Sequence, residues 1–445
     1  MSTRDVGTVN RAIEQQPETA IPSRSLARRS ALASFVGTSI EWYDFFLYGT
    51  AATLVFPRVF FTQLGGAVAV LVSLATFSAA FVLRPVGGIV FGHFGDRISR
   101  KGMLITTFLA MGLGTFLIGL LPGYAQIGVA APLLLVVLRM VQGLAIGGEW
   151  GGAALIAVEN APPGRRGLYG SGLQVGAPFG LLLGTGAFAL ASRLPADQLL
   201  SWGWRLPFLA SALLLPVGMY VRLRIEDSAA FRAVLATGRR ARMPLAEMLA
   251  VAKRRAVLLI FVQMVINTGW YVFTTYSVVY ATNNLKLPGS WVLDAVFVAA
   301  GLDILLQPLF GRLSDSVGRR PVYLFGTAVT GCMAFPFFWL MGTREQSLII
   351  VAMVIAFGIG HSATGSLNGP LYAEQFPTRI RYTGVSFGYQ MSSLITSTPV
   401  APLAAALVAV TGAVSWVSAY VLLAAVVSFV CVLLLQETYR SDITA

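Results

Sequence analysis

Long apolar runs alternate with short polar segments along nearly the whole chain. A helix that crosses a membrane needs about 20 mainly apolar residues, and twelve segments meet this requirement. Six of them precede a polar stretch, and six follow it. The pattern therefore predicts an all-α membrane protein with 12 transmembrane helices. The predicted spans lie near residues 31–56, 67–91, 103–122, 130–157, 169–192, 204–223, 256–281, 291–311, 321–341, 347–372, 383–410 and 413–435.

The polar stretch divides the chain into two halves, and the basic residues indicate how these halves are oriented. Of the 32 Lys and Arg residues, 25 fall on one side of the membrane in this arrangement, five on the other and two inside spans. An excess of basic residues marks the cytoplasmic side. We therefore expect a cytoplasmic N-terminal tail at 1–30, a six-helix bundle at 31–223, a cytoplasmic central loop at 224–255, a second bundle at 256–436 and a cytoplasmic tail at 437–445.

The composition narrows the class of protein further. Hydrophobic residues make up 56% of the chain and charged residues 11%, whereas soluble domains have about 25% charged residues. The net charge of +13 lies in short loops and forms no basic stripe interleaved with aromatic residues, so we expect no nucleic-acid partner. The two cysteines and two histidines lack ligand spacing. We expect the lipid bilayer as partner, no metal, no cofactor and no enzymatic activity.

Two short motifs occur once in each half. The segment 92–101 matches the segment 311–320, with a Gly, an Asp and both basic positions offset by 219 residues. A Glu followed by Pro at +3 and Arg at +7 begins at Glu159 and again at Glu374, offset by 215 residues. Two motifs that keep nearly the same offset indicate duplication of a six-helix unit, as in transporters whose halves rock against each other.

The first repeated motif resembles the loop signature of the major facilitator superfamily, although Ser99 stands where that signature has Gly. More specifically, the segment 41–49 (Glu-Trp-Tyr-Asp-Phe-Phe-Leu-Tyr-Gly) is similar to the first helix of the metabolite:proton symporter family. That family includes shikimate, α-ketoglutarate, citrate and proline/betaine carriers. The resemblance implies the major facilitator fold, which has two pseudo-symmetric six-helix bundles. It also implies a monomer that binds a small-molecule solute and protons.

Acidic residues inside predicted spans are candidates for proton coupling. Glu41 and Asp44 are three residues apart and share one helical face with Tyr48. A charged carboxylate in a membrane is costly and is expected to face a wet cavity or a cation. Asp44 and Glu41 are therefore predicted proton sites, with the alternative that Glu41 reaches the interface and only Asp44 is buried. Asp303 is either a further proton site or the partner of a cytoplasmic Arg.

Two arginines inside spans are candidates for binding a carboxylate. Arg139, with Gln142 on nearly the same face, offers a planar fork of donors that suits an anion. The alternative is a structural pairing with Asp44 or Glu41. Arg84 lies either in the binding region, as the resemblance implies, or snorkels to the interface. Further solute-binding candidates, chosen as polar or aromatic side chains within spans, are Tyr48, Asn267, Tyr271, Gln307 and Tyr389.

The repeated motifs carry charges that are too dense for a binding pocket. The resemblance implies that Asp96 binds a neighbouring helix end and that the basic residues form a charge cluster that locks the cytoplasmic gate. The alternative is a purely topogenic role for the basic residues. The predicted gating residues are Gly92, Asp96, Arg97, Arg100, Lys101, Glu159, Asp315, Arg319, Arg320 and Glu374.

These features predict a proton-coupled symporter in the cytoplasmic (inner) membrane that imports a small organic acid, such as a shikimate-like acid, a dicarboxylate or a keto acid. One alternative is a proton symporter of a zwitterion such as proline or betaine. The osmosensing carriers of that kind have a long cytoplasmic C-terminal coiled coil, whereas here the last expected span ends at residue 435 of 445, which favours the organic acid. The other alternative is a non-transporting sensor on the same scaffold.

Overall fold

The structure, a computed structural model, describes residues 24–238 and 240–443, so most of the predicted N-terminal tail lies outside the described residues. Within that part the regular structure is helical. Ten helical segments are long and apolar enough to cross a membrane, and the bent pair α18–α19 adds an eleventh. The 31-residue helix α2 is the twelfth span and packs along α8. Helix α2 carries Glu41 and Asp44, and these polar residues lower its mean hydropathy below that of the other spans.

Each half of the chain contributes six spans. The first half contains α2 (Arg24–Leu54), α3 (Phe56–Val59), α4 (Gly66–Arg97), α5 (Arg100–Leu120), α6 (Tyr124–Ile127), α7 (Ala130–Glu159), α8 (Arg166–Ala191), α9 (Ala196–Gln198), η1 (Leu199–Gly203), α10 (Arg205–Leu209) and α11 (Ser211–Leu223). The second half contains α14 (Lys253–Val262), α15 (Met264–Trp270), η2 (Tyr271–Tyr276), α16 (Ser277–Asn283), α17 (Gly289–Val317), α18 (Arg319–Cys332), α19 (Pro336–Gly342), α20 (Gln346–Met353), η3 (Val354–Ile359), α21 (Gly360–Gly365), α22 (Asn368–Glu374), η4 (Thr378–Ile380), α23 (Arg381–Ser392), η5 (Ser393–Ser397), α24 (Val400–Thr411) and α25 (Ser415–Leu434).

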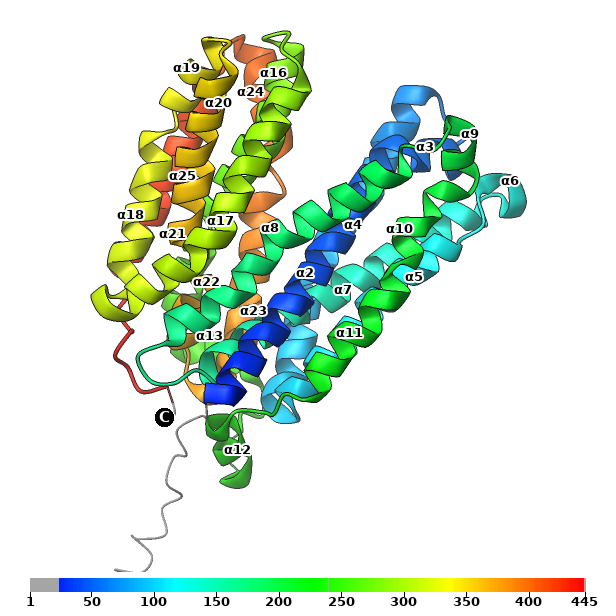
Figure 1. Cartoon of the computed structure of the whole chain (residues 1–445). Coiled ribbons are helices and arrows are strands. Elements are labelled where there is room, and N and C mark those ends of the chain that lie inside the picture. Colours follow the sequence, from blue (N-terminus) through cyan, green and yellow to red (C-terminus); the bar gives the residue numbers. More distant parts are fainter. Residues whose placement is uncertain (1–23, 239, 444–445) are drawn as a thin grey trace, which may run out of the picture.

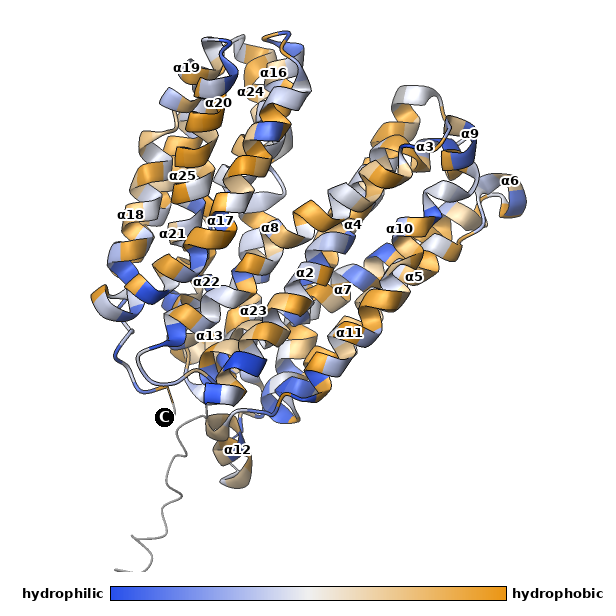
Figure 2. Cartoon of the chain, in the orientation of Figure 1, coloured by the Kyte–Doolittle hydropathy of each residue, from blue (hydrophilic) through white to orange (hydrophobic). Residues whose placement is uncertain are grey.

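The two halves form two bundles that meet at one end and diverge at the other (Figure 1). The bundles are apolar along their length, and hydrophilic residues gather at the ends (Figure 2). The segment predicted as a central loop contains two short helices, α12 (Ala229–Ala236) and α13 (Pro244–Val251). Their apolar sides are buried through Phe231 and Met248.

Three spans of the second half contain a π-helical turn, namely η2, η3 and η5. Such turns interrupt the regular hydrogen-bond ladder and occur often at functional sites. Each of them lies beside a residue that faces the space between the bundles, as described below. In the first bundle, glycines allow close contact between two of the spans.

The contact between α4 and α7 depends on the absence of side chains at Gly143 and Gly147. A Cβ at Gly147 would lie 2.2 Å from the carbonyl oxygen of Arg84, and a Cβ at Gly143 would lie 2.3 Å from that of Ala80. Backbone atoms cannot move aside as a flexible side chain can. The sequence therefore uses small residues to bring these two helices together.

We expect Gly147→Ala to destabilise the first bundle by about 1–3 kcal/mol, the usual cost of overpacking. The measurement is the thermal unfolding midpoint of the purified protein in detergent. Gly301→Ala is the matched control, because a Cβ at Gly301 meets no atom within 4 Å among the described residues. Equal unfolding midpoints for the two variants would show that the α4–α7 contact tolerates a methyl group.

Candidate functional site

A cavity lies between the two bundles and is lined by residues from both. The volume that the centre of a water molecule can occupy inside the cavity is about 50 Å³. This is room for a few water molecules. Seven lining residues come from the first half and nine from the second. Among them are the predicted site residues Glu41, Arg84, Asn267, Tyr271 and Tyr389.

Glu41 and Arg84 are the charged side chains that the first half presents to this cavity. Glu41 Oε2 is buried without a hydrogen-bond partner among the described residues. The Arg84 guanidinium lies 4.1 Å from the centre of the Phe81 ring, and it makes no ion pair with any described carboxylate. The cavity therefore holds one acid and one base that are both available to a ligand.

Asp44 and Arg139 form a separate buried cluster inside the first bundle. Arg139 Nη1 lies 3.3 Å from Asp44 Oδ2, and Thr115 donates a 2.5 Å hydrogen bond to Asp44 Oδ1. Gln142 donates to both Asp44 oxygens at 3.3 Å. The Arg139 guanidinium covers the Tyr48 ring at 4.2 Å.

The structure therefore does not place Arg139, Gln142 or Tyr48 on the cavity, where the sequence led us to expect them. The reason is that the face of α2 that carries Asp44 turns toward α5 and α7 within the same bundle, so these side chains satisfy one another. This geometry corresponds to the alternative in which Arg139 is the partner of Asp44.

A second buried cluster surrounds Asp303 in the second bundle. The Asp303 carboxylate accepts hydrogen bonds from Gln307 at 2.9 Å and from Ser362 at 2.6 Å. His361 Nδ1 lies 3.1 Å from Asp303 Oδ2. Gln307, predicted to bind solute, thus lies behind the cavity wall, whereas His361 forms part of that wall. Asp303 thus contacts a histidine. The predicted alternative, in which a cytoplasmic Arg is its partner, is not observed among the described residues.

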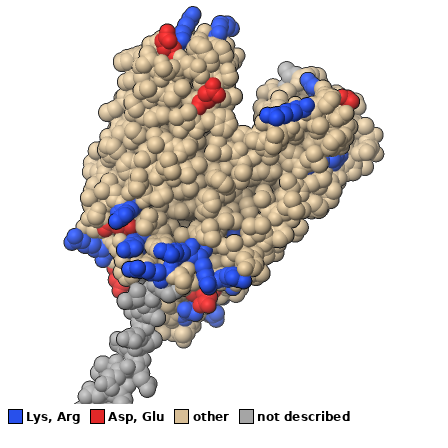
Figure 3. All heavy atoms as spheres, in the orientation of Figure 1, with Lys and Arg blue, Asp and Glu red and all other residues tan. Residues whose placement is uncertain are grey.

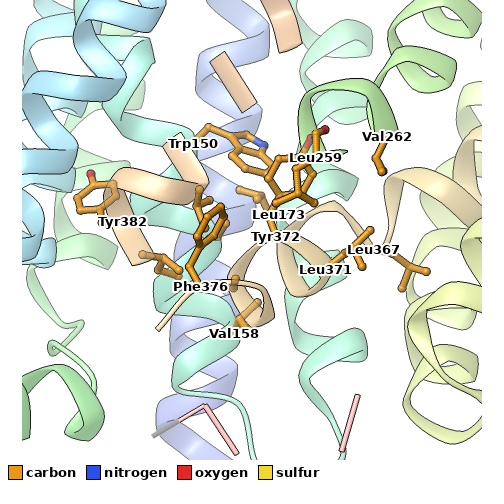
Figure 4. Packing of buried hydrophobic residues seen from close by; sticks show 14 of the residues in the cluster. Trp150, Val158, Leu173, Leu259, Val262, Leu367, Leu371, Tyr372, Phe376 and Tyr382 are labelled. Carbon is orange, nitrogen blue, oxygen red and sulfur yellow. The ribbon is translucent and has the colours of Figure 1, made fainter. Parts of the chain in front are cut away.

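Aromatic residues of the two halves contact each other at the cavity. Tyr389 stacks on Trp150 from the opposite half, with ring centres 3.6 Å apart, and Trp42 contacts Trp270 across the halves at 5.2 Å. Beyond Trp150, buried apolar side chains from both bundles interlock (Figure 4). This layer includes Val158 and Leu173 from the first half with Leu259, Leu367, Leu371, Tyr372, Phe376 and Tyr382 from the second.

The repeated acidic residue of each half binds the start of a helix in the other half. Asp96 accepts hydrogen bonds from the backbone amides of Tyr382 and Thr383, at 3.0 and 2.8 Å, at the beginning of α23. A negative charge at a helix N-terminus is favourable. Gly92 allows this approach, because a Cβ there would lie 2.8 Å from Thr383 Cα.

Asp315 repeats this arrangement at the beginning of α8. It accepts hydrogen bonds from the amides of Gly167 and Leu168 at 2.8 and 3.0 Å. The two copies of the Glu–Pro–Arg motif lie beside these contacts. Glu159 forms ion pairs with Arg100 and with Arg381 of the other half, and Glu374 forms them with Arg319 and, at 3.8 Å, with Arg166 of the other half.

These ion pairs lie at the end of the molecule where Lys and Arg gather, opposite the notch between the lobes (Figure 3). Three predicted gating residues lie outside the ion-pair cluster. Arg97 contacts His93 at 3.0 Å. Lys101 and Arg320 donate to backbone carbonyls at the ends of α11 and α25. The charged cluster at this end comprises the four acids Asp96, Glu159, Asp315 and Glu374 and the four arginines Arg100, Arg166, Arg319 and Arg381.

Asp96→Asn should loosen the closed end of the molecule. The side-chain amide offers one acceptor oxygen where the carboxylate has two, and the charge opposite α23 is lost. At about 1–3 kcal/mol for an unsatisfied buried donor, the population of the open form should rise by roughly 5- to 150-fold relative to the closed form. The measurement is the maleimide reactivity of a cysteine at the buried position Ser386, with Cys332 and Cys431 replaced by Ser. Asp197→Asn, an exposed acid at the other end, is the control, and equal reactivity in both variants would contradict the prediction.

Sequence reasoning missed several members of the site. His361 was set aside because it lacks metal-ligand spacing, yet it lines the cavity together with Trp42 and Gln174. Arg222, at the end of the predicted span 204–223, was counted among the 25 basic residues of the cytoplasmic side, but it is buried and lies 2.5 Å from Glu149. The available signal for Arg222 was its position at the end of an apolar run, opposite an acid in another span.

Two bundles of six spans around a shared polar cavity define a membrane transporter. The Major Facilitator Superfamily profile matches residues 34–397 and 290–443. The chain is 40% identical over 434 residues to the shikimate transporter of Escherichia coli (strain K12), covering 96% of this chain and 99% of that one. It is 42% identical over 436 residues to the inner membrane metabolite transport protein YhjE of the same organism, covering 96% and 98%. The fold resembles that of the proton:xylose symporter XylE, with a TM-score of 0.73, 15% identity and coverage of 94% and 98%.

The chain belongs to the major facilitator superfamily. It is therefore a multi-pass membrane transporter and not an enzyme, and the predicted fold with 12 transmembrane helices is confirmed.

Proposed function

We propose that this protein is a proton-coupled symporter that imports a small organic acid across the cytoplasmic membrane, as a monomer and by alternating access. The observation that carries the proposal is Arg84. It is a guanidinium in the wall of the cavity between the halves, and it forms no ion pair with a carboxylate among the described residues. A buried cation of this kind favours an anionic ligand, and the planar fork of Arg suits a carboxylate.

The proposed proton sites are Asp44 and Glu41. Asp44 is paired with Arg139, so protonation of Asp44 removes the negative charge that holds this pair together. Glu41 lies in the cavity wall with Arg84. Protonation of Glu41 leaves Arg84 as the net charge that an arriving carboxylate meets. Both acids lie in α2, so proton binding and solute binding act on the same helix.

The gate assignment follows from the charge distribution. We propose that the end with the ion pairs faces the cytoplasm, together with both termini and the segment 224–255. The notch between the lobes then faces outward. The apolar layer that includes Trp150 and Tyr382 then separates the cavity from the cytoplasm. The boundaries proposed for the two bundles are 31–223 and 256–436, with helices α2 and α14 beginning several residues earlier.

Cysteine labelling tests this orientation. A cysteine at Thr237, in the segment 224–255, should react in intact cells only with reagents that enter the cytoplasm, because the basic side stays inside. A cysteine at Thr343, in the turn between α19 and α20, is the matched position and should react with impermeant maleimide from outside. Both residues are exposed. The reverse labelling pattern would overturn the orientation.

The function itself is tested by uptake into proteoliposomes with an imposed proton gradient. The panel contains radiolabelled shikimate, dicarboxylates, α-ketoglutarate, aromatic acids and betaine. We expect accumulation of at least one organic acid that collapses when a protonophore dissipates the gradient. Accumulation that needs no proton gradient would contradict coupling, and accumulation of betaine alone would contradict the proposed solute class.

A zwitterion is the second candidate solute, because a specific feature of the cavity favours it. Glu41 and Arg84 are both unpaired in one small space, so a solute with one positive and one negative group could satisfy both. The wall also contains Trp42, Trp270 and Tyr271, and aromatic faces attract quaternary ammonium groups. The betaine arm of the uptake panel decides between the two solute classes.

A further inference from the structure

The buried acids of the spans differ in the kind of partner that balances their charge. Asp44 pairs with Arg139 and Glu149 pairs with Arg222. An arginine stays protonated under all ordinary conditions, so each of these pairs is neutral without any further proton. Asp303 has no such partner among the described residues. Its three neighbours within hydrogen-bond distance are Ser362, Gln307 and His361.

Hydrogen bonds from Ser362 and Gln307 stabilise a carboxylate but do not cancel its charge. A bare carboxylate in a membrane protein interior is costly, and Asp303 is completely buried. Within the described part of the chain, the group that can neutralise it is His361, which does so by carrying one extra proton shared with Asp303. In an arginine pair only the carboxylate can change its charge, whereas here the imidazole offers a second group that can take up the proton.

The surroundings of His361 connect this proton to the solute cavity. Its Nδ1 faces Asp303 of α17, and the residue lines the cavity wall. The Trp270 ring of α15 and the Phe357 ring of η3 lie 5.0 and 4.9 Å away. At its contact with α21, helix α18 presents Gly326 and Thr330, which carry no charge. The remaining titratable or charged groups in the cavity wall are Glu41, Arg84, Tyr271 and Tyr389.

We propose that His361 and Asp303 form a second proton-binding site, through which the second bundle takes part in coupling and in binding an anionic solute. With Asp303 ionised, Nδ1–H donates to the carboxylate and the lone pair of Nε2 is free to accept a proton. Proton binding forms an Nε2–H bond and turns an acceptor into a charged donor at the cavity wall. An acid bound between Arg84 of one half and His361 of the other then draws the two bundles together. The inference rests on the proposed function, because it gives the solute two cationic contacts, one from each half.

The chain has two histidines, His93 and His361, so a direct test is available that does not depend on transport. We propose ¹⁵N NMR of the purified full-length protein, labelled at histidine, over about pH 5 to 8, in wild type and in Asp303→Asn. We expect a larger imidazolium fraction of His361 in wild type than in Asp303→Asn at the same pH, because the variant removes the negative partner of the ring.

His93 is the internal control, since it contacts Arg97 and not Asp303; its titration should be the same in both proteins. His361→Gln identifies which signal belongs to which ring. Addition of shikimate or α-ketoglutarate should increase the imidazolium fraction of His361 at a fixed pH. If Asp303→Asn does not yield folded protein, the test is the increase in the imidazolium fraction of wild-type His361 on addition of either acid. The responding signal should be absent from the spectrum of His361→Gln.

A His361 signal that titrates identically in wild type and in Asp303→Asn would overturn the proposal. So would a ring that stays neutral throughout in wild type and is unaffected by either acid. These outcomes are distinct from a failure of the proposed function. A titrating dyad in a protein that accumulates no organic acid would leave the proton site standing and contradict only the solute class.

Discussion

Asp44→Asn should abolish proton-driven accumulation of solute and preserve exchange of internal for external solute. Asn resembles the protonated acid, and its side-chain oxygen can still accept the 2.5 Å hydrogen bond from Thr115. The variant therefore holds position 44 permanently in its neutral form and cannot release a proton. Exchange requires no net proton movement, so it should continue. The measurements are gradient-driven uptake, which should fall at least tenfold, and counterflow in the same proteoliposomes.

The matched control is Asp294→Asn, which also neutralises an aspartate of a spanning helix. Asp294 is exposed and accepts a hydrogen bond from Gln346, so both activities should stay at the wild-type level. Survival of gradient-driven uptake in Asp44→Asn would move the N-terminal proton site to Glu41. Loss of exchange together with uptake, in a protein that remains folded, would show that Asp44 is a structural partner of Arg139 and no proton carrier.

The fold could be predicted from the sequence because its signals are local or repeat along the chain. Apolar runs of spanning length and the polar stretch 224–255 gave the arrangement of two bundles. The repeats also contained a geometric relation that the sequence did not reveal. Each acid of the first motif binds a helix of the other half, so Asp96 meets α23 and Asp315 meets α8. The two copies of the motif thus make equivalent contacts, each reaching from its own half to a helix of the other half.

The site was harder to predict, because helical periodicity shows which residues share a face but not what that face meets. Asp44 and Glu41 are neighbours on α2, yet Asp44 turns into the bundle and Glu41 turns to the cavity. Arg139 was the first choice for a solute ligand, and its charge is already used by Asp44. His361 contacts Asp303, which lies 58 residues away in the sequence. Such partnerships depend on tertiary packing and leave no local pattern.

The cavity charge leads to the second large effect, which is expected at Arg84. A hydrogen bond to a charged group contributes about 1.5–3 kcal/mol, and about 1.4 kcal/mol corresponds to a tenfold change in affinity. Arg84→Gln should therefore weaken binding of an organic acid by roughly 10- to 100-fold. Arg84→Lys should fall in between, because Lys keeps the charge but loses both the planar fork and the stacking on Phe81.

The measurement is the concentration dependence of counterflow for the acid that wild type transports, or calorimetric binding of the same acid. Arg193→Gln removes an exposed arginine outside the cavity and should leave the affinity unchanged. Glu41→Gln separates the two solute classes. An organic acid should bind this variant at least as well as wild type, because the neighbouring negative charge is gone, whereas a zwitterion should bind it more weakly. Unchanged affinity in Arg84→Gln would show that the anion is held elsewhere, and the remaining cationic candidate in the cavity wall is then protonated His361.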